Sequence, residues 1–460
     1  MLQTFIGNKS FYRRLIRLML PIMIQNGITN FVNMLDNIMI GAVGTAQMTG
    51  VALTNQLIFV FNLCIFGAVS GAGIFATQFF GSGDHEGVRH TFRFKLLFCG
   101  LITLLGIALL AFQGESLLRL YMQGDQGLTD AAATLEHAKG YMSIMLIGLI
   151  PFTAVQCYSS TLRESANPTV PMVAGVVAVL VNLVFNYILI FGKFGAPALG
   201  VNGAAIATVL SRFVELAVVV IWTHCSGAFP FMKGVFKSLY VPRQLAARLF
   251  VKGLPLMLNE TLWASGIAIV NQCYSTRGLD AVAAGNISQT FWNVFAIAYM
   301  AVGNAIGILL GQMLGAGKLK EAKDSSYKMI AFSFVIAICV GVIYSFCAEF
   351  IPMVYNTEPE IRTLATRLMQ ITAIAMPFEA LTHASYFTLR SGGKMMITLI
   401  FDSGFMWCVN VLLAVVLSRF TDISFPWLFT ALQMTAAIKA LFGILLVKKG
   451  DWVRNITSHS

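Results

Sequence analysis

The sequence predicts an all-α polytopic membrane protein with twelve transmembrane helices in two lobes of six helices each. Three observations support this fold class. The 460-residue chain is 57% hydrophobic and 11% charged, whereas a soluble chain has about 25% charged residues. Apolar runs of about 20 residues, the length that crosses a bilayer, recur along the whole chain. Finally, the second half of the chain repeats the first.

The predicted spans follow one another closely and leave no room for a large soluble domain. Runs such as "LLFCGLITLLGIALLAF" and "MIAFSFVIAICVGVIYSF" are long enough to cross a membrane. The basic segment "NKSFYRRLIR" leads directly into the first span, so no cleavable signal peptide is expected. The predicted spans are residues 15–40, 50–78, 94–113, 138–162, 170–192, 201–224, 249–274, 283–311, 328–351, 365–390, 395–417 and 425–447.

The net charge is +11, and the basic residues are distributed in accordance with the predicted topology. Of the 31 Lys and Arg residues, 22 lie at the termini and in alternate connections, including the basic linker 225–250. Because positive charge marks the cytoplasmic side, we expect both termini in the cytoplasm and the chain in the cell (inner or plasma) membrane. This distribution explains the charge without a nucleic-acid partner. The eight cysteines show no CxxC spacing, which predicts neither a structural metal site nor a disulfide framework.

The internal repeat has a constant offset of 234 residues. "LPIMIQN" (20–26) matches "LPLMLNE" (254–260), and the same offset continues without a gap. It pairs Gly73 with Gly307, Gln78 with Gln312, and Gly81 with Gly315. Since both halves begin on the same side and span six times, they are parallel repeats, predicted as lobes 1–228 and 229–460. Parallel repeats of this kind build transporters whose site lies between the lobes near mid-membrane.

"QFFGSGD" (78–84) and "QMLGAGK" (312–318) mark the same junction in each half, after the second span of six. With these motifs, "NYILIFGKFGAPALGVNGAAIATVLS" (186–211) and "TLRSGGK" (388–394), nearly the whole chain resembles the multidrug and toxic compound extrusion (MATE) family. The resemblance implies a monomeric antiporter, coupled to H⁺ or Na⁺, that exports small organic, often cationic, compounds. It implies alternating access and no cofactor.

Acidic residues within the spans are the strongest functional signal. An ionised carboxylate there is costly unless it is paired or hydrated. Five acids lie well inside predicted spans: Asp36, Glu215, Glu260, Glu379 and Asp402. Glu215 follows Arg212 by three residues, so a local ion pair is expected. Asp402 lies at the depth of Lys439, which favours an ion pair between helices and leaves a functional role open.

Asp36 ends a polar stripe on the first span. The stripe members are Gln25, Thr29, Asn33 and Asp36. Their spacing places them on one helix face, which should line a cavity. Pro21 removes a backbone hydrogen bond below the stripe and permits a bend. The alternative is a buried acid satisfied by neighbouring amides.

Glu260 breaks the symmetry of the repeat, as Asp36 does. Glu260 pairs with Asn26 and Asp36 pairs with Val270, whereas a structural device should occur in both halves. By resemblance, Asp36 is a proton or cation site, and the acids Glu260 and Glu379 are NorM-like cation sites where Na⁺ is possible. Pro255 permits a bend before Glu260.

Further polar residues are expected to support these acids. The resemblance places Asn182 and Asn186 of the fifth span, together with Thr208, around Asp36. Asparagine does not titrate, so Asp36 would be the only titrating group of its lobe. His383 follows Glu379 by one helical turn, and it is either a hydrogen-bonded core residue or a proton-sharing partner.

The substrate cleft is expected on the second, seventh and eighth spans, which face it in the family. Aromatic faces attract organic cations, although packing is the commoner role of such residues. The candidates are Phe61, Trp263, Gln289, Trp292 and Tyr299.

Three other functions fit the sequence less well than an antiporter. A flippase of lipid-linked saccharide precursors should line its cleft with Arg and Lys, whereas the ionisable groups within these spans are mainly acidic. A passive channel would need no alternating access. The sequence contains no Walker A, HExxH or CxxC pattern, and we expect no enzyme.

Overall fold

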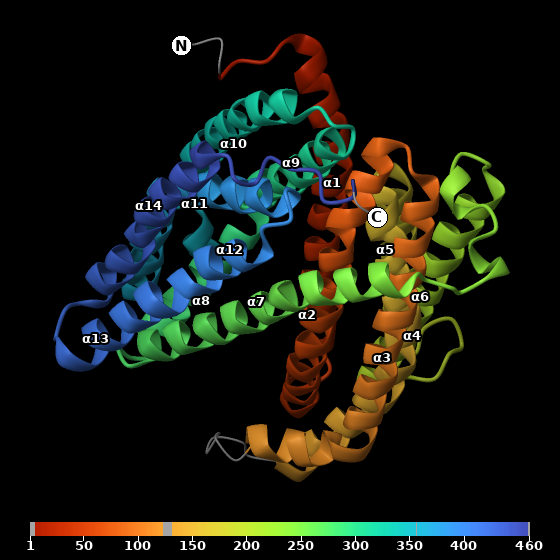
Figure 1. Cartoon of the computed structure of the whole chain (residues 1–460). Helices are drawn as coiled ribbons and strands as arrows, with labels where there is room; N and C mark the ends of the chain where they lie inside the picture. Colours follow the sequence, from red (N-terminus) through yellow and green to blue (C-terminus); the bar gives the residue numbers. More distant parts are fainter. Residues whose placement is uncertain (1–4, 123–130, 356, 459–460) are drawn as a thin grey trace. The chain divides into compact units, whose positions relative to one another are not determined.

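The computed structural model describes residues 5–122, 131–355 and 357–458, and within these ranges it contains helices and turns but no strand (Figure 1). Eleven helices in the described part are long and apolar enough to cross a membrane. The tenth predicted span, 365–390, also forms one long helix, α11 (Pro359–Ser391), but its polar side chains keep it below the same standard of hydropathy. The predicted all-α, membrane-spanning class is confirmed.

The helices of the first half are α1 (Lys9–Gly41), α2 (Thr45–Ser82), α3 (His85–Met122), α4 (Ala131–Glu164), α5 (Thr169–Phe191) and α6 (Gly200–Cys225). Those of the second half are α7 (Arg243–Ser275), α8 (Leu279–Phe295), α9 (Ile297–Gly315), α10 (Leu319–Cys347), α11, α12 (Met395–Leu399), α13 (Leu412–Phe420) and α14 (Phe425–Lys449). The predicted eighth span is therefore two helices, α8 and α9, which meet at Ala296. Two π-helical turns, Ile400–Gly404 and Met406–Val411, join α12 to α13.

The chain forms two compact units. Unit 1 comprises residues 1–23, 77–84 and 251–460, and unit 2 comprises residues 24–76 and 85–250. Within unit 1, α11 is the central helix and packs against α8, α9, α10 and α14. Within unit 2, α6 packs against α4 and α5, and α3 packs against α4. The helices α1 and α2 each contribute residues to both units.

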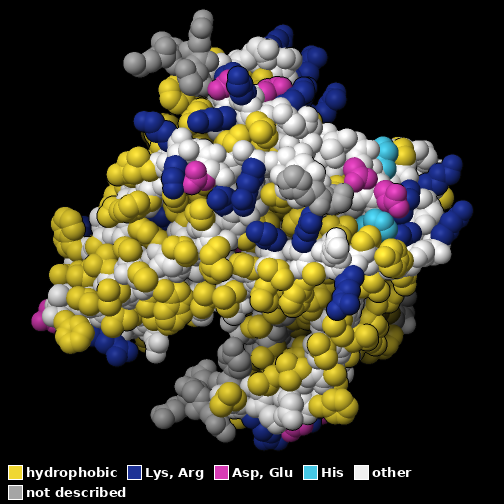
Figure 2. Space-filling view, viewed as in Figure 1, with side chains coloured by type: hydrophobic (Ala, Val, Ile, Leu, Met, Phe, Trp, Pro, Cys, Tyr) yellow, Lys and Arg dark blue, Asp and Glu magenta, His cyan; other side chains and the backbone are white. Residues whose placement is uncertain are grey.

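The surface of unit 1 is suited to lipid. Figure 2 shows hydrophobic side chains spread over the side that carries α13 and α14. Large apolar residues of α14, such as Ile438, Leu441 and Phe442, are more than half exposed at 52%, 59% and 53%. An apolar surface of this extent is unfavourable in water but matches the hydrocarbon core of a bilayer.

Two glycines allow the ends of α2 and α9 to meet at backbone contact within unit 1. A methyl group added to Gly81 would overlap the backbone of Gln312, and one added to Gly315 would overlap the backbone of Gln78. Small residues permit this close approach of membrane helices. The contact is reciprocal, because the offset of 234 residues relates both glutamines and both glycines.

The segment after α14, residues 450–458, folds over this crossing. Trp452 is completely buried. The side chain of Gln78 accepts a hydrogen bond from the backbone N of Ile456 at 2.8 Å. Asn455 donates its Nδ2 to the carbonyl of Gly315 at 3.1 Å. The C-terminal segment is thus bonded to both helices of the crossing.

We expect Gly81→Ala and Gly315→Ala each to destabilise the purified protein by about 1–3 kcal/mol, the usual cost of overpacking. The obstructing atoms are backbone, so they cannot rotate away. Gly100→Ala on α3 is the matched control, because its added methyl group meets no atom within 4 Å. Thermal unfolding in detergent measures all three variants. Equal melting temperatures for the Gly315 and Gly100 variants would contradict the close crossing.

Candidate functional site

Asp36 lies on α1 and faces two amides of α5 within unit 2. Its Oδ1 accepts a hydrogen bond from Asn186 Nδ2 at 2.6 Å. In the amide orientation that satisfies both of its ends, Asn182 places its nitrogen 3.0 and 3.1 Å from the two carboxylate oxygens and accepts from Thr208 Oγ1 at 3.3 Å. Both asparagines are buried. The structure therefore brings Asn182, Asn186 and Thr208 together around Asp36.

The other members of the α1 stripe do not bond to Asp36. Thr29 donates its hydroxyl to the carbonyl of Gln25, within its own helix, at 2.9 Å. The Gln25 side chain lies beside Gly175 of α5, and its Oε1 is buried without a partner in the described part of the chain. Asn33 is exposed. The helix α1 continues through Pro21 as a single element.

Tyr141 of α4 also belongs to the surroundings of Asp36. It is buried, its hydroxyl bonds to the side chain of Asn55 on α2, and the charge of Asp36 acts on it. Sequence reasoning missed this tyrosine, because a single hydroxyl in an apolar span has no spacing that distinguishes it from a core residue.

In unit 1, two aromatic donors hold Glu379 of α11. Its Oε2 accepts hydrogen bonds from Trp292 Nε1 at 3.0 Å and from the Tyr299 hydroxyl at 2.8 Å. Trp292 lies near the end of α8 and Tyr299 near the start of α9. The backbone at Ala296 stays helical, with φ −64° and ψ −22°, so Trp292 and Tyr299 lie on the same face of the helical path. Trp292 and Tyr299, expected to line the substrate cleft, are hydrogen-bond partners of an acid.

Asp402 forms the predicted ion pair. Its Oδ1 is 2.6 Å from Lys439 Nζ, and its Oδ2 accepts from Asn259 Nδ2 at 2.9 Å. Asn259 is buried and accepts through its own Oδ1 from Ser403 Oγ at 2.7 Å. Asp402 and Ser403 both lie in the first π-helical turn, a local irregularity that often occurs at functional sites.

Glu260 follows Asn259 on α7, in the helix that contains Pro255, and is partly buried. No hydrogen bond or ion pair joins it to another residue of the described chain. Its electrostatic neighbours are Arg390 and Asp402. Arg390 is 8% exposed, and its guanidinium lies over neighbouring aromatic rings.

The contacts of the His383 ring are with residues other than Glu379. Its ring bonds to the backbone of Met300, and it packs against Gly303 and the ring of Phe387. Its Nε2 is buried without a partner among the described residues. The hydrogen bonds to Glu379 come from aromatic residues instead.

The remaining residues predicted for the cleft differ in their environments. Phe61 is buried and packs against Gly106 of α3. Trp263 is exposed on α7. Gln289 is exposed on α8 and bonds to Asn293 at 3.1 Å. Their role in substrate binding stays a prediction.

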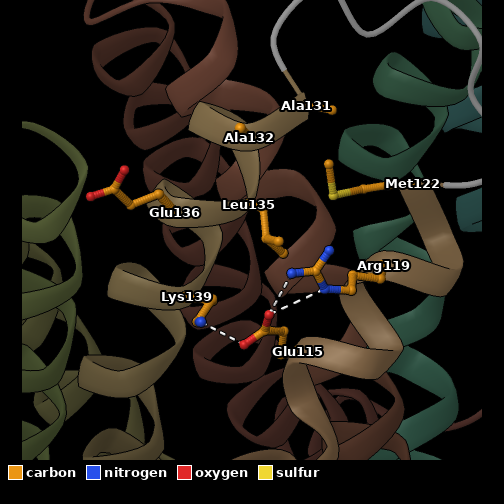
Figure 3. A pocket seen from close by; sticks show the side chains of 8 residues that line it. All are labelled: Glu115, Arg119, Met122, Ala131, Ala132, Leu135, Glu136 and Lys139. Carbon is orange, nitrogen blue, oxygen red and sulfur yellow. Dashed lines mark hydrogen bonds and ion pairs between the residues drawn. The ribbon is translucent and has the colours of Figure 1, made fainter.

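A separate hollow of about 590 Å³ lies between α3 and α4 and contains none of the predicted site residues (Figure 3). Glu115 lies 2.7 Å from Arg119 and 2.5 Å from Lys139. The other carboxylate that lines the hollow, Glu136, points away from Glu115 in Figure 3. Glu115 is thus already paired with two cations. The described residues contain no group of three or more His, Cys, Asp or Glu that could hold a metal ion.

The chain matches one protein-family model and is similar to several known proteins. The family model described as MatE matches residues 21–188 and 255–416. "Probable multidrug resistance protein NorM" of Thermotoga maritima is 22% identical over 440 residues, 96% of this chain and 93% of that protein. "Multidrug resistance protein MdtK" of Yersinia enterocolitica is 28% identical and aligns with 79% of this chain and 78% of its own length. A solved structure, "Outward-facing conformation of a multidrug resistance MATE family transporter of the MOP superfamily", has a TM-score of 0.86 at 18% identity and covers 97% of this chain and 98% of its own.

Removing the Tyr299 hydroxyl should leave Glu379 with one donor fewer. We expect Tyr299→Phe to lower the free energy of unfolding by about 1.5–3 kcal/mol, the contribution of a hydrogen bond to a charged group. The loss should be smaller in a Glu379→Gln background, because the neutral amide needs the donor less. A double-mutant cycle of thermal unfolding measures this coupling. Tyr187→Phe, at an exposed tyrosine, is the control, and an equal loss there would contradict the assignment.

Proposed function

The chain belongs to the MatE family of membrane transporters, and on this premise we propose that it is a cation-coupled antiporter that exports small organic cations. It is a transporter and not an enzyme. Relatives whose names describe multidrug resistance support organic compounds as cargo. The observation that carries the coupling is the presence of carboxylates within membrane-spanning helices: Asp36 on α1, Glu260 on α7 and Glu379 on α11.

The acids supply a coupling mechanism. An ionised carboxylate pays a desolvation cost that depends on its surroundings, and binding of a proton or Na⁺ removes the charge. If the two alternating conformations solvate an acid differently, neutralising that acid shifts the equilibrium between them. An organic cation competes for the same negative charge. Entry of the coupling ion from outside then favours release of the compound.

The proposed transport cycle uses the two lobes and the membrane orientation predicted from the sequence. The lobes 1–228 and 229–460 alternate between inward and outward access, and both termini lie in the cytoplasm of a cell whose inner or plasma membrane holds the protein as a monomer. The basic segments at the termini and in the linker support this orientation, because positive charge is retained on the cytoplasmic side.

A flippase of lipid-linked saccharides is the alternative, and it requires basic groups that are free to bind an anionic headgroup. Two of the basic side chains within the spans are paired: Lys439 with Asp402 and Arg212 with Glu215, the latter at 2.9 Å. This pairing disfavours an anionic cargo. Saturable binding of an anionic pyrophosphate lipid to the purified protein would reverse the preference.

Neutral substitutions of the three acids test the coupling. We expect Asp36→Asn, Glu260→Gln and Glu379→Gln each to lower export of a fluorescent organic cation from cells at least about tenfold, the effect of about 1.4 kcal/mol on a rate. Glu360→Gln is the matched control, because Glu360 is an exposed acid in the first turn of α11. Membrane insertion is verified for each variant by detergent extraction. Normal export by all three neutral variants would exclude these acids from coupling.

Imposed gradients test the antiport itself. Proteoliposomes that hold an organic cation should release it when a proton or sodium gradient is applied across the membrane, and should retain it when neither is present. Protein-free liposomes control for leakage. Release that follows the gradient of the organic compound alone, with no response to either ion, indicates a passive channel.

A further inference from the structure

Lys439 of α14 lies beside a carboxylate and two aromatic rings inside unit 1. Its Nζ is 2.6 Å from Asp402 Oδ1 and 5.5 and 5.8 Å from the ring centroids of Phe401 and Phe405. The side chains of Lys439 and Asp402 are 13% and 19% exposed. A carboxylate flanked by aromatic faces is an environment that binds an ammonium group. Here the ammonium group is part of the chain.

Both carboxylate oxygens of Asp402 already accept from donors. Asp402 accepts from Lys439 with one oxygen and from Asn259 with the other. The side-chain oxygen of Asn259 accepts from Ser403, and Glu379 accepts from two aromatic donors through one oxygen. Hard metal cations bind through several oxygen ligands, so a sodium ion would have to displace these donors. An ammonium nitrogen cannot itself be a metal ligand.

Lys439 also acts on the acids proposed to couple transport. Its positive charge acts on Glu379, and the charge of Asp402 acts on Glu260. Arg390 supplies a second fixed cation that acts on Glu260. The carboxylates of unit 1 therefore have positive charge from two side chains before any ion enters.

We propose that Lys439 is a tethered cation that determines the coupling ion: it keeps Asp402 occupied, excludes sodium from this carboxylate, and leaves the proton to neutralise Glu260 and Glu379. The proposal rests on the proposed cation-coupled transport. A proton needs a single oxygen of a carboxylate, whereas sodium needs several oxygens at once. Loss of the lysine charge would free one Asp402 oxygen and create room for a small cation beside it.

The experiment measures sodium binding to purified protein, apart from transport. Wild type, Lys439→Met, Lys439→Arg and the double variant Lys439→Met with Asp402→Asn are unfolded thermally in NaCl and in KCl of equal concentration. We expect sodium to raise the melting temperature of Lys439→Met by about 2 °C or more through ligand linkage. Sodium should not change the melting temperature of the other three proteins. Wild type and Lys439→Arg keep a positive charge beside Asp402, and the double variant lacks the carboxylate that would bind sodium.

Two results would overturn the proposal. One is a folded Lys439→Met protein whose melting temperature does not respond to sodium. The other is saturable binding of radioactive sodium to the wild type that Asp402→Asn abolishes, and this measurement decides the matter even if Lys439→Met does not fold. If neither the wild type nor any variant transports an organic cation, the proposed function is wrong. The sodium-binding measurement still tests the role of Lys439 independently.

Discussion

An ionised carboxylate inside a membrane protein costs several kcal/mol unless donors or a counter-charge satisfy it. This cost organises the polar side chains of both units. Asp36 faces two amides, Glu379 has two aromatic donors, and Asp402 has an amide and a lysine. Glu260 has no such partner in the described part of the chain.

Irregularities in the helices occur beside several of these acids. The helical path through Ala296 is not one of them, because its backbone keeps helical hydrogen bonds to Trp292 and from Met300. The π-helical turn at Ile400–Gly404 widens the backbone at Asp402 and Ser403. Proline residues lie within α1, α7 and α11, the helices that carry the three proposed coupling acids. Irregular backbone thus coincides with charge.

Hydropathy was enough to predict a chain of membrane-spanning helices. The neighbours of Asp36 were also predictable, because Asn182 and Asn186 lie one turn apart and a family resemblance links them to the first span. The partners of Glu379 were not, because Trp292 and Tyr299 lie on a different predicted span, and the spacing within a span does not reveal which side chains of another helix it contacts. The pair of Asp402 and Lys439 was expected from equal depth, but depth alone did not reveal Asn259 between the helices. The C-terminal segment over the crossing of α2 and α9 had no signal in periodicity, since its contacts are made by backbone and single side chains.

The crossing of α2 and α9 has the form of a symmetric dimer interface. In such an interface residue i of one copy contacts residue j of the other, and j contacts i in return. Gln78 meets Gly315 and Gln312 meets Gly81 in this manner within one chain. Two separate, identical half-chains could make the same crossing, but they could not place an acid in one half alone. Because the two halves are one chain, Asp36 can have a valine, Val270, as its equivalent in the repeat. The two halves can therefore carry different polar residues while the crossing of α2 and α9 keeps the same residues in both.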